Sequence, residues 1–314
     1  MIKETEHLLP ASRGTGKIYA KFWSVDDPIA VVQIAHDVGE HILRYDVFAD
    51  FLNDNKIAVC GNDHAGHGRS TLPDERGFFS ESNGCVNSIL DIYVLNKMTR
   101  DKFKDVPIFL FGHGVGSCFA RIYSLQHYKT IKGLILSGTC GESTYISKVI
   151  EECEKVIYRT NIYERNEKLH KFIYNSYNSR VREKSTEYDW LSSISYEVDS
   201  YVDDEMCGLD YTAGLAYDIF LAMTAATDKA WAKQLNKDLP IMIISGSDDP
   251  FGRYGEGAKQ TYTRLKKAKA NDVSMRIYKE SRHDILHDAC MDTVHDDIFN
   301  WIRSTLHNER DYIE

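Results

Sequence analysis

Short apolar runs alternate with longer amphipathic stretches along this chain. Of all its sequence features, this alternation restricts the possible folds most. It is typical of β-α-β units, which build a mainly parallel sheet with helices on its faces. The chain is therefore predicted to be an α/β protein with a mostly parallel central sheet. The predicted strands are Lys17–Trp23, Ile29–Ala35, Ile57–Asn62, Pro107–Phe111, Ile131–Ser137, Leu239–Ser245 and Val273–Lys279.

Two of the amphipathic stretches repeat apolar residues at helical spacing, and we expect both stripes to face the core. They comprise Val86, Ile89, Leu90, Tyr93 and Val94 in the first half of the chain, and Val294, Ile298, Trp301 and Ile302 near its C-terminus.

Residues 141 to about 238 interrupt the alternation, because this stretch is rich in Tyr, Lys and Glu and lacks a clean buried-strand run. We predict a helical insertion at 141–238 between a first α/β part, residues 1–140, and a second, residues 239–314. Ligands of open α/β sheets bind at the carboxyl ends of the strands. The insertion is therefore either a lid lined with apolar surface for an acyl chain or a small helical subdomain with its own core, and the two do not exclude each other.

Charge and composition argue against several classes of partner. The net charge of -9 over 314 residues disfavours nucleic acid, whose phosphates would be repelled. No apolar stretch approaches the roughly 20 residues of a membrane span. The seven cysteines form no CxxC pair and no signal peptide is evident, so we expect a soluble, cytoplasmic protein with reduced thiols. Its oligomeric state does not follow from the sequence.

The run from Pro107 to Phe111 leads directly into Gly112-His113-Gly114-Val115-Gly116, and a helical pattern follows. This is the strand–turn–helix context of the G-x-S-x-G nucleophile elbow, in which the middle residue attacks the substrate. Gly114 occupies that position and has no side chain to attack with. Glycine relieves the backbone strain of the elbow, which costs a serine about 1–3 kcal/mol. A nucleotide phosphate loop is disfavoured, since the run does not match G-x-G-x-x-G.

An acid and a base follow in the order nucleophile, acid, base that this motif requires. Asp249, preferred over Asp248, comes just after a predicted strand, where a carboxylate can hold an imidazole in one tautomer. His283 follows the last predicted strand and is the expected base. His283 and His287 are also spaced as in a zinc helix, but no third ligand is evident, so no metal site and no cofactor are predicted.

Stabilisation of an oxyanion needs two backbone N–H groups, and we predict those of Val115 and Val38. Asp37 lies beside them, where a carboxylate is counterproductive unless it points away into a cap or turn. Asp37 and His113 are expected to contact the substrate. Ser117 and Cys118 are poor replacements for the nucleophile because they lie about one turn into the helix.

These residues resemble the α/β-hydrolase family of monoacylglycerol lipases and bacterial lysophospholipases, often described as serine aminopeptidase-like. The resemblance spans nearly the whole chain. Two departures fall on the catalytic machinery, since Gly114 replaces the serine and Asp37 replaces a glycine beside the oxyanion donor. The matching segments are His36-x-x-Gly39-Glu40-His41 with Arg44-Tyr45, Asp63-His64-x-Gly66-His67-Gly68-Arg69-Ser70, Gly112-His113-Gly114-Val115-Gly116 and Ser281-Arg282-His283-Asp284.

The resemblance implies an α/β-hydrolase fold with a helical cap, acyl-ester cleavage and no cofactor. Two functions remain open. The chain is either a carboxylic ester hydrolase that has lost its serine and is inactive or very weak, or a natural pseudoenzyme that binds an acyl or other small apolar ligand or a protein partner. Asp37 favours the second, and the retained Asp249 and His283 favour the first. A slow reaction through water activated by His283 is a minor third possibility.

Overall fold

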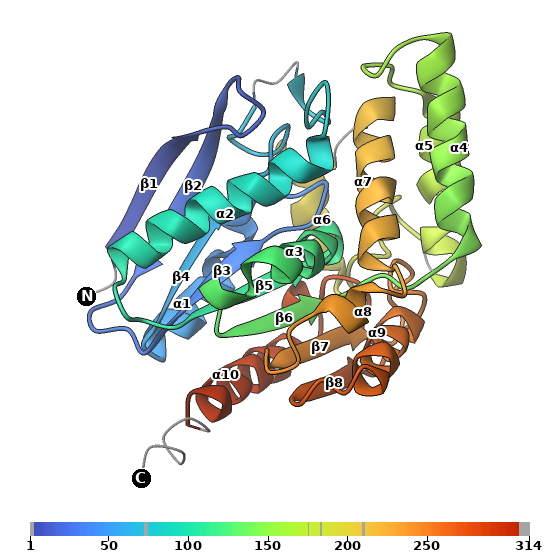
Figure 1. The fold of residues 1–314 in the computed structure, drawn as a ribbon. Helices are drawn as coiled ribbons and strands as arrows, with labels where there is room; N and C mark the ends of the chain where they lie inside the picture. The colour runs from blue at the N-terminus through green and yellow to red at the C-terminus, as the bar shows by residue number, and fades with distance from the viewer. Residues whose placement is uncertain (1–2, 72–74, 175, 183, 209–210, 308–314) are drawn as a thin grey trace.

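The computed structural model describes residues 3–71, 75–174, 176–182, 184–208 and 211–307, which form an eight-stranded sheet with helices on both faces (Figure 1). The strand order is β1-β2-β4-β3-β5-β6-β7-β8. The pairs β1/β2 and β2/β4 are antiparallel and the remaining pairs are parallel. The predicted mostly parallel α/β sheet is confirmed. The strands are β1 (Lys3–Pro10), β2 (Lys17–Ser24), β3 (Ala30–Ala35), β4 (Ile57–Asn62), β5 (Ile108–His113), β6 (Gly133–Ser137), β7 (Ile241–Gly246) and β8 (Val273–Tyr278).

All seven predicted strands are present with small shifts of their ends, and the edge strand β1 was missed. β1 alternates between exposed and half-buried residues, and it pairs only with β2. A strand at a sheet edge buries little, so its sequence lacks the apolar run by which the central strands are recognised.

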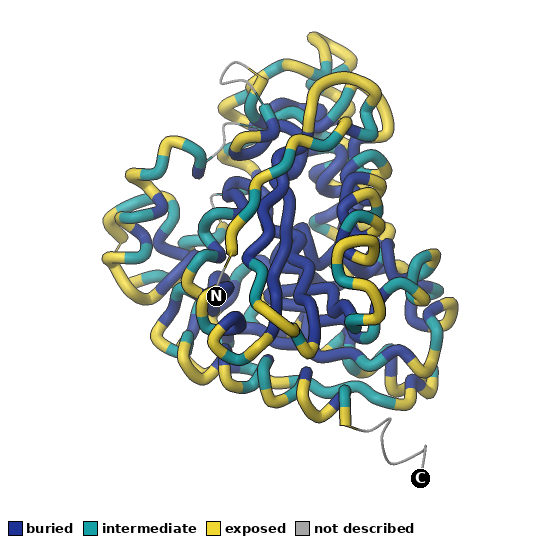
Figure 2. Tube along the Cα trace, turned by 90° about the vertical axis from the view of Figure 1, so that its left-hand side faces the viewer, coloured by how far each residue is buried: buried dark blue, intermediate teal, exposed yellow. Residues whose placement is uncertain are grey.

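Helices cover both faces of the sheet and bury one hydrophobic core on each side. In Figure 2 the central strands are dark blue, for buried, whereas exposed yellow segments lie mostly at the periphery. The helices outside the insertion are η1 (Ile42–Tyr45), α1 (Asp46–Asp54), α2 (Gly84–Lys102), α3 (Gly114–His127), η3 (Tyr128–Thr130), α9 (Glu256–Lys267), η5 (Ile285–His287) and α10 (Met291–His307).

The C-terminal stripe faces the core as predicted, with Val294, Ile298 and Ile302 buried in α10. The stripe predicted for α2 is right for Ile89, which is buried, and wrong for Val86, Leu90 and Val94, which are exposed. The buried face of α2 instead combines apolar residues with polar ones that have partners inside the protein, and hydrogen bonding allows such burial. It consists of Ser88, Ile89, Asp91, Ile92, Leu95, Asn96 and Thr99.

The helical stretch between β6 and β7 gathers at one end of the sheet, where α4, α5 and α7 are labelled side by side in Figure 1. α7 contacts both α4 and α3, so the stretch packs onto the helix that follows Gly114. Its action as a lid stays a prediction. The helices are α4 (Thr144–Arg159), α5 (Glu167–Tyr174), η4 (Tyr177–Arg180), α6 (Ser195–Asp203), α7 (Ala213–Ala226) and α8 (Trp231–Gln234).

Candidate active site

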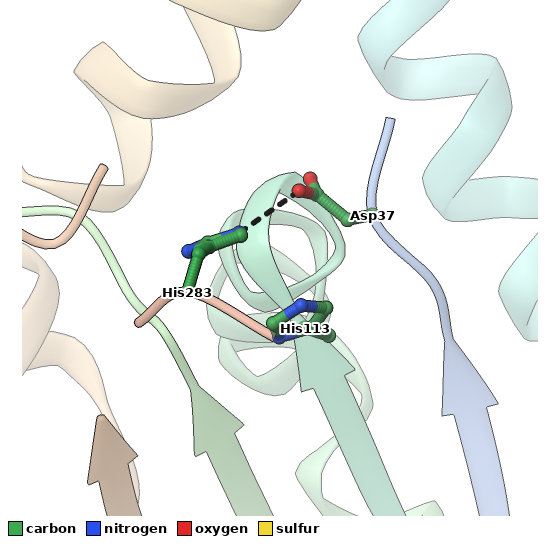
Figure 3. Close-up of side chains that lie close together, drawn as sticks. All are labelled: Asp37, His113 and His283. Atoms are coloured by element: carbon green, nitrogen blue, oxygen red, sulfur yellow. Dashed lines mark hydrogen bonds and ion pairs between the residues drawn. The ribbon is translucent and has the colours of Figure 1, made fainter. Parts of the chain in front are cut away.

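The carboxyl ends of four parallel strands bring the candidate site together. Asp37 follows β3, Gly114 follows β5 at the start of α3, Asp249 follows β7, and His283 follows β8. Figure 3 shows Asp37 and His283 pointing toward each other above the end of the strand that carries His113. All of these residues except the glycine contribute buried side chains. The fold therefore collects residues from distant parts of the sequence at one sheet edge, as expected for an open α/β sheet.

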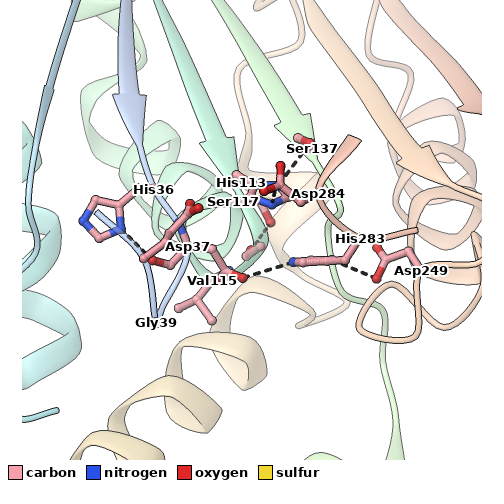
Figure 4. A network of polar contacts seen from close by, with 12 residues as sticks. His36, Asp37, Gly39, His113, Val115, Ser117, Ser137, Asp249, His283 and Asp284 are labelled. Atoms are coloured by element: carbon pink, nitrogen blue, oxygen red, sulfur yellow. Dashed lines mark hydrogen bonds and ion pairs between the residues drawn. The ribbon is translucent and has the colours of Figure 1, made fainter. Parts of the chain in front are cut away.

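Asp249 and His283 form the predicted acid–base contact. The Nδ1 atom of His283 lies 2.8 Å from Oδ1 of Asp249, and both side chains are fully buried (Figure 4). Asp248 is exposed and bonds its neighbour Ser247 instead. The geometry thus favours Asp249 as the residue that orients the imidazole, while its catalytic role stays a prediction.

The position of the missing serine is filled by the carboxylate of Asp37. Gly114 has a φ of +51°, and a Cβ atom built on it would lie 2.1 Å from Cγ of Asp37 and 2.3 Å from each of its oxygens. No side chain fits at residue 114 while Asp37 keeps this position, because heavy atoms cannot approach so closely. The two departures from the family pattern are therefore spatially coupled.

The two carboxylate oxygens of Asp37 are bonded to the groups that a reacting ester would need. Oδ1 accepts a hydrogen bond of 2.6 Å from the backbone N–H of Val115, the predicted oxyanion donor. Oδ2 lies 3.0 Å from Nε2 of His283 (Figure 3). The alternative that Asp37 points away into a cap or turn is wrong, since an imidazole and an N–H group hold its carboxylate in the site.

The contact between Asp37 and His283 is an ion pair. Although burial opposes protonation, the carboxylates of Asp249 and Asp37 raise the pKa of His283 well above its usual value. Burial likewise opposes ionisation of Asp37, but hydrogen bonding and the charge of His283 lower the pKa of Asp37 below its usual value. A protonated His283 has no lone pair with which to take up a proton, so it is not a general base in this state.

Backbone and side-chain bonds fix Asp37 in this position. Its N–H donates to Oε1 of Glu40 at 2.8 Å, and Tyr45 donates to the same oxygen at 2.7 Å. The carbonyl oxygen of Asp37 accepts a hydrogen bond from Nδ1 of His36 at 2.5 Å. His36 is neutral, since burial lowers its pKa well below the usual value, and its Nε2 accepts from the backbone of His64. These contacts hold the loop that carries Asp37, and sequence reasoning assigned none of these partners a role.

A second group of buried charged side chains contacts Glu40 and so helps to hold the loop that carries Asp37. Arg44 bonds Oε2 of Glu40 at 3.3 Å and Oδ2 of Asp284 at 2.9 Å. His287 contacts that same oxygen of Asp284 at 2.9 Å. Burial opposes ionisation of Asp284, but His287 and Arg44 hold its pKa well below the usual value. Glu40, Arg44 and Asp284 belong to the motifs quoted above, so those motifs were the available signal for this network.

The remaining residues predicted for the site lie near the Asp37 carboxylate. Val38 and His113 border the cavity above the site. Nδ1 of His113 lies 3.2 Å from the hydroxyl of Ser137, and its ring lies 4.6 Å from that of His283. Ser117 bonds the carbonyl of Gly114 and the hydroxyl of Thr139, so its side chain is committed to holding the turn.

Ring nitrogens and a carboxylate oxygen of Asp37, His113 and His283 lie within 4.8 Å of one another, which is close enough to hold a metal ion. The ring of His113 is tilted by 30° from that of His283, and Nδ1 of His113 lies 3.2 Å from the hydroxyl of Ser137. Nε2 of His283 is also already bonded to Asp37. His287, the partner suggested by zinc-helix spacing, contacts Asp284 and the carbonyl of Arg44 instead.

A narrow apolar cavity opens above the Asp37 carboxylate. It has room for water-sized molecules in about 40 Å³, which corresponds to a few waters. A long acyl chain therefore enters only when the lining side chains move apart. The walls are aromatic and aliphatic, and they include Tyr174, Tyr177, Tyr188, Trp190, Leu191, Tyr201, Tyr211, Phe220, Met223 and Phe251.

The geometry at residue 114 predicts a cost for restoring the serine alone. Gly114→Ser places a side chain in the space of the Asp37 carboxylate and at a positive φ. We expect it to lower the free energy of unfolding by about 2–4 kcal/mol, through overpacking and backbone strain. Urea unfolding of the single variant and of Asp37→Gly/Gly114→Ser measures this. The second substitution removes the clash and should recover part of the loss. A single variant as stable as the parent chain would contradict the coupling.

Comparison with known proteins places this geometry in a family. The family described as serine aminopeptidase, S33, matches residues 26–289. The monoglyceride lipase of Mus musculus is 24% identical over 275 residues, which cover 86% of this chain and 80% of the mouse protein. A monoglyceride lipase homolog of Monkeypox virus is 32% identical over 120 residues, 38% of this chain and 42% of the viral protein.

Solved structures agree with the fold. A thermostable carboxyl esterase from Bacillus coagulans, in complex with glycerol, superimposes with a TM-score of 0.91 at 26% identity, covering 98% of this chain and all of the esterase. A soluble variant of the monoglyceride lipase from Saccharomyces cerevisiae has a TM-score of 0.75 at 18% identity, covering 97% and 95% of the two chains, and shows the fold alone. Among the helices that the structure describes, none is both long and apolar enough to cross a membrane. With a match that runs from residue 26 to residue 289, this chain belongs to the serine aminopeptidase S33 family of lipase- and esterase-like α/β-hydrolases.

Proposed function

We propose that this chain is a catalytically silent member of its family that keeps the cavity as a binding site for an acyl or other small apolar ligand. One observation carries the proposal. The carboxylate of Asp37 lies where the side chain of a serine at residue 114 would lie, and it engages both His283 and the N–H of Val115. The nucleophile, the base and an oxyanion donor are thus all unavailable to an ester.

The aromatic cavity supports the binding half of the proposal. The aromatic and aliphatic walls lie at the carboxyl edge of the sheet, where ligands of open α/β sheets bind. Concave sites with mostly apolar walls and a few polar groups are the usual form of small-molecule sites. Relatives named as monoglyceride lipases and a carboxyl esterase support an acyl or similarly apolar ligand.

The retained contact between Asp249 and His283 at 2.8 Å favours a second candidate, a weak ester hydrolase. In that case turnover proceeds through water activated by His283, or through attack by the Asp37 carboxylate. Both routes require the pair between Asp37 and His283 to open first. The ion pair makes this candidate the weaker one.

The test is hydrolysis of short and long acyl esters by the unaltered chain, with His283→Ala and Asp37→Asn as companions. We expect all three proteins to match the uncatalysed rate. Turnover abolished by His283→Ala would overturn the silent assignment, and additional loss in Asp37→Asn would assign the attack to the carboxylate. Asp248→Asn, at the exposed neighbouring carboxylate, is the matched control.

A further inference from the structure

The carboxylate of Asp37 borders the cavity. An anionic head group would need the N–H of Val115 and a protonated His283 to neutralise it. Asp37 already holds both, at 2.6 and 3.0 Å. A second carboxylate arriving here finds neither donor free, and it meets a like charge in a buried setting where screening by solvent is weak.

The surrounding charges do not reverse this effect. The side chains linked to Asp37 by the contacts described above include three further carboxylates, those of Asp249, Glu40 and Asp284. Three basic side chains balance them, those of His283, Arg44 and His287. Each of these three basic side chains is already paired with a carboxylate, and Asp37, Glu40 and Asp284 all border the cavity.

The same carboxylate is a good partner for a hydroxyl or amide head group. Each oxygen of Asp37 uses one acceptor site, toward Val115 or toward His283, and a carboxylate oxygen has a second. A ligand that donates a hydrogen bond gains this acceptor without displacing either protein partner. Hydrogen bonds to a charged acceptor are the stronger kind.

Resting on the proposed function, we propose that this cavity selects single-chain amphiphiles whose head group donates a hydrogen bond and carries no negative charge, and that Asp37 rejects the corresponding carboxylates. The apolar walls hold the chain once the lining side chains have moved apart to admit it, and Asp37 accepts a hydrogen bond from the head group. The site is thereby matched to an uncleaved neutral lipid or alcohol rather than to the fatty acid that ester hydrolysis releases.

Isothermal titration calorimetry tests this selectivity with three eight-carbon probes at pH 7.5, below the concentrations at which they aggregate. The probes are 1-octanol, octanamide and octanoate, of which the last two have nearly the same shape and differ in charge. We expect octanol and octanamide to bind at least tenfold more tightly than octanoate. Octanoate binding as tightly as octanamide, or no binding of any probe, would overturn the inference.

Asp37→Asn supplies the complementary arm, because it removes the charge and keeps the size of the side chain. We expect the preference for octanamide over octanoate to shrink to within about threefold in this variant. A preference that persists unchanged would assign the selectivity to another residue and overturn the role of Asp37. Equal binding of octanoate and octanamide would overturn the selectivity and leave the proposed function standing. No binding of any probe would count against the proposed binding site itself.

Discussion

Asp37→Gly/Gly114→Ser is expected to hydrolyse acyl esters at least about a hundredfold faster than either single variant or the parent chain. The double change supplies the attacking oxygen and removes the carboxylate from the space that the oxygen needs. It also frees Nε2 of His283 and the N–H of Val115, while the contact between Asp249 and His283 remains. A single oxyanion donor is typically worth a factor of 10² to 10³, and the nucleophile of a triad is worth more.

The single variants fail for different reasons in this account. In Gly114→Ser the Asp37 carboxylate still competes with the serine for the same space, for His283 and for the N–H of Val115, and Asp37→Gly lacks a nucleophile. Initial rates with a series of acyl esters from four to sixteen carbons measure the effect. Gly114→Ser/Asp248→Asn is the matched control, since it removes a carboxylate that does not touch the site. Full activity in Gly114→Ser alone would mean that the carboxylate does not obstruct the site.

Asp37→Asn is expected to lower the free energy of unfolding by about 3 kcal/mol at pH 5.5, and by less where the pH exceeds the raised pKa of His283 in the folded state. The raised pKa of His283 stabilises the folded state fully below the unfolded value of about 6.5, and this contribution is lost as the pH rises through the folded pKa. The lowered pKa of Asp37 contributes above about 3.9 and is lost as the pH falls through its folded pKa. The pair therefore stabilises most between these two unfolded values.

Urea unfolding of the parent chain and of Asp37→Asn at pH 5.5, 7.0 and 8.5 measures this dependence. Asp248→Asn at the same pH values is the control, and we expect it to change stability little because its carboxylate is exposed. A destabilisation by Asp37→Asn no larger at pH 5.5 than that caused by Asp248→Asn would show that the contact between Asp37 and His283 is not an ion pair.

The sequence was sufficient to predict the central strands and the order of the elbow, acid and base. Strands such as Ile241–Gly246 are buried on both faces and so are apolar over most of their length, and the carboxyl ends of parallel strands meet at one edge. The buried face of α2 was mispredicted because Asp91 and Asn96 are buried with partners, Ser12 and Gln33, that lie far away in the sequence.

The orientation of the Asp37 side chain could not be predicted from the sequence. Its carboxylate is directed by Val115 and His283, which are 78 and 246 residues away along the chain. Local propensity at Asp37 equally permits a side chain that caps a turn. Only the folded contacts show that the Asp37 carboxylate occupies the space that a side chain at residue 114 would need.

The central claim is that the Asp37 carboxylate takes the place of the nucleophile's side chain, and phosphonylation tests it most directly. An alkyl fluorophosphonate is added to the parent chain, to Gly114→Ser and to Asp37→Gly/Gly114→Ser, and intact mass is recorded over time. We predict a single adduct at residue 114 of the double variant and no adduct on the other two proteins. Labelling of Gly114→Ser at the rate of the double variant would contradict the claim, because the serine would then be free to react beside Asp37.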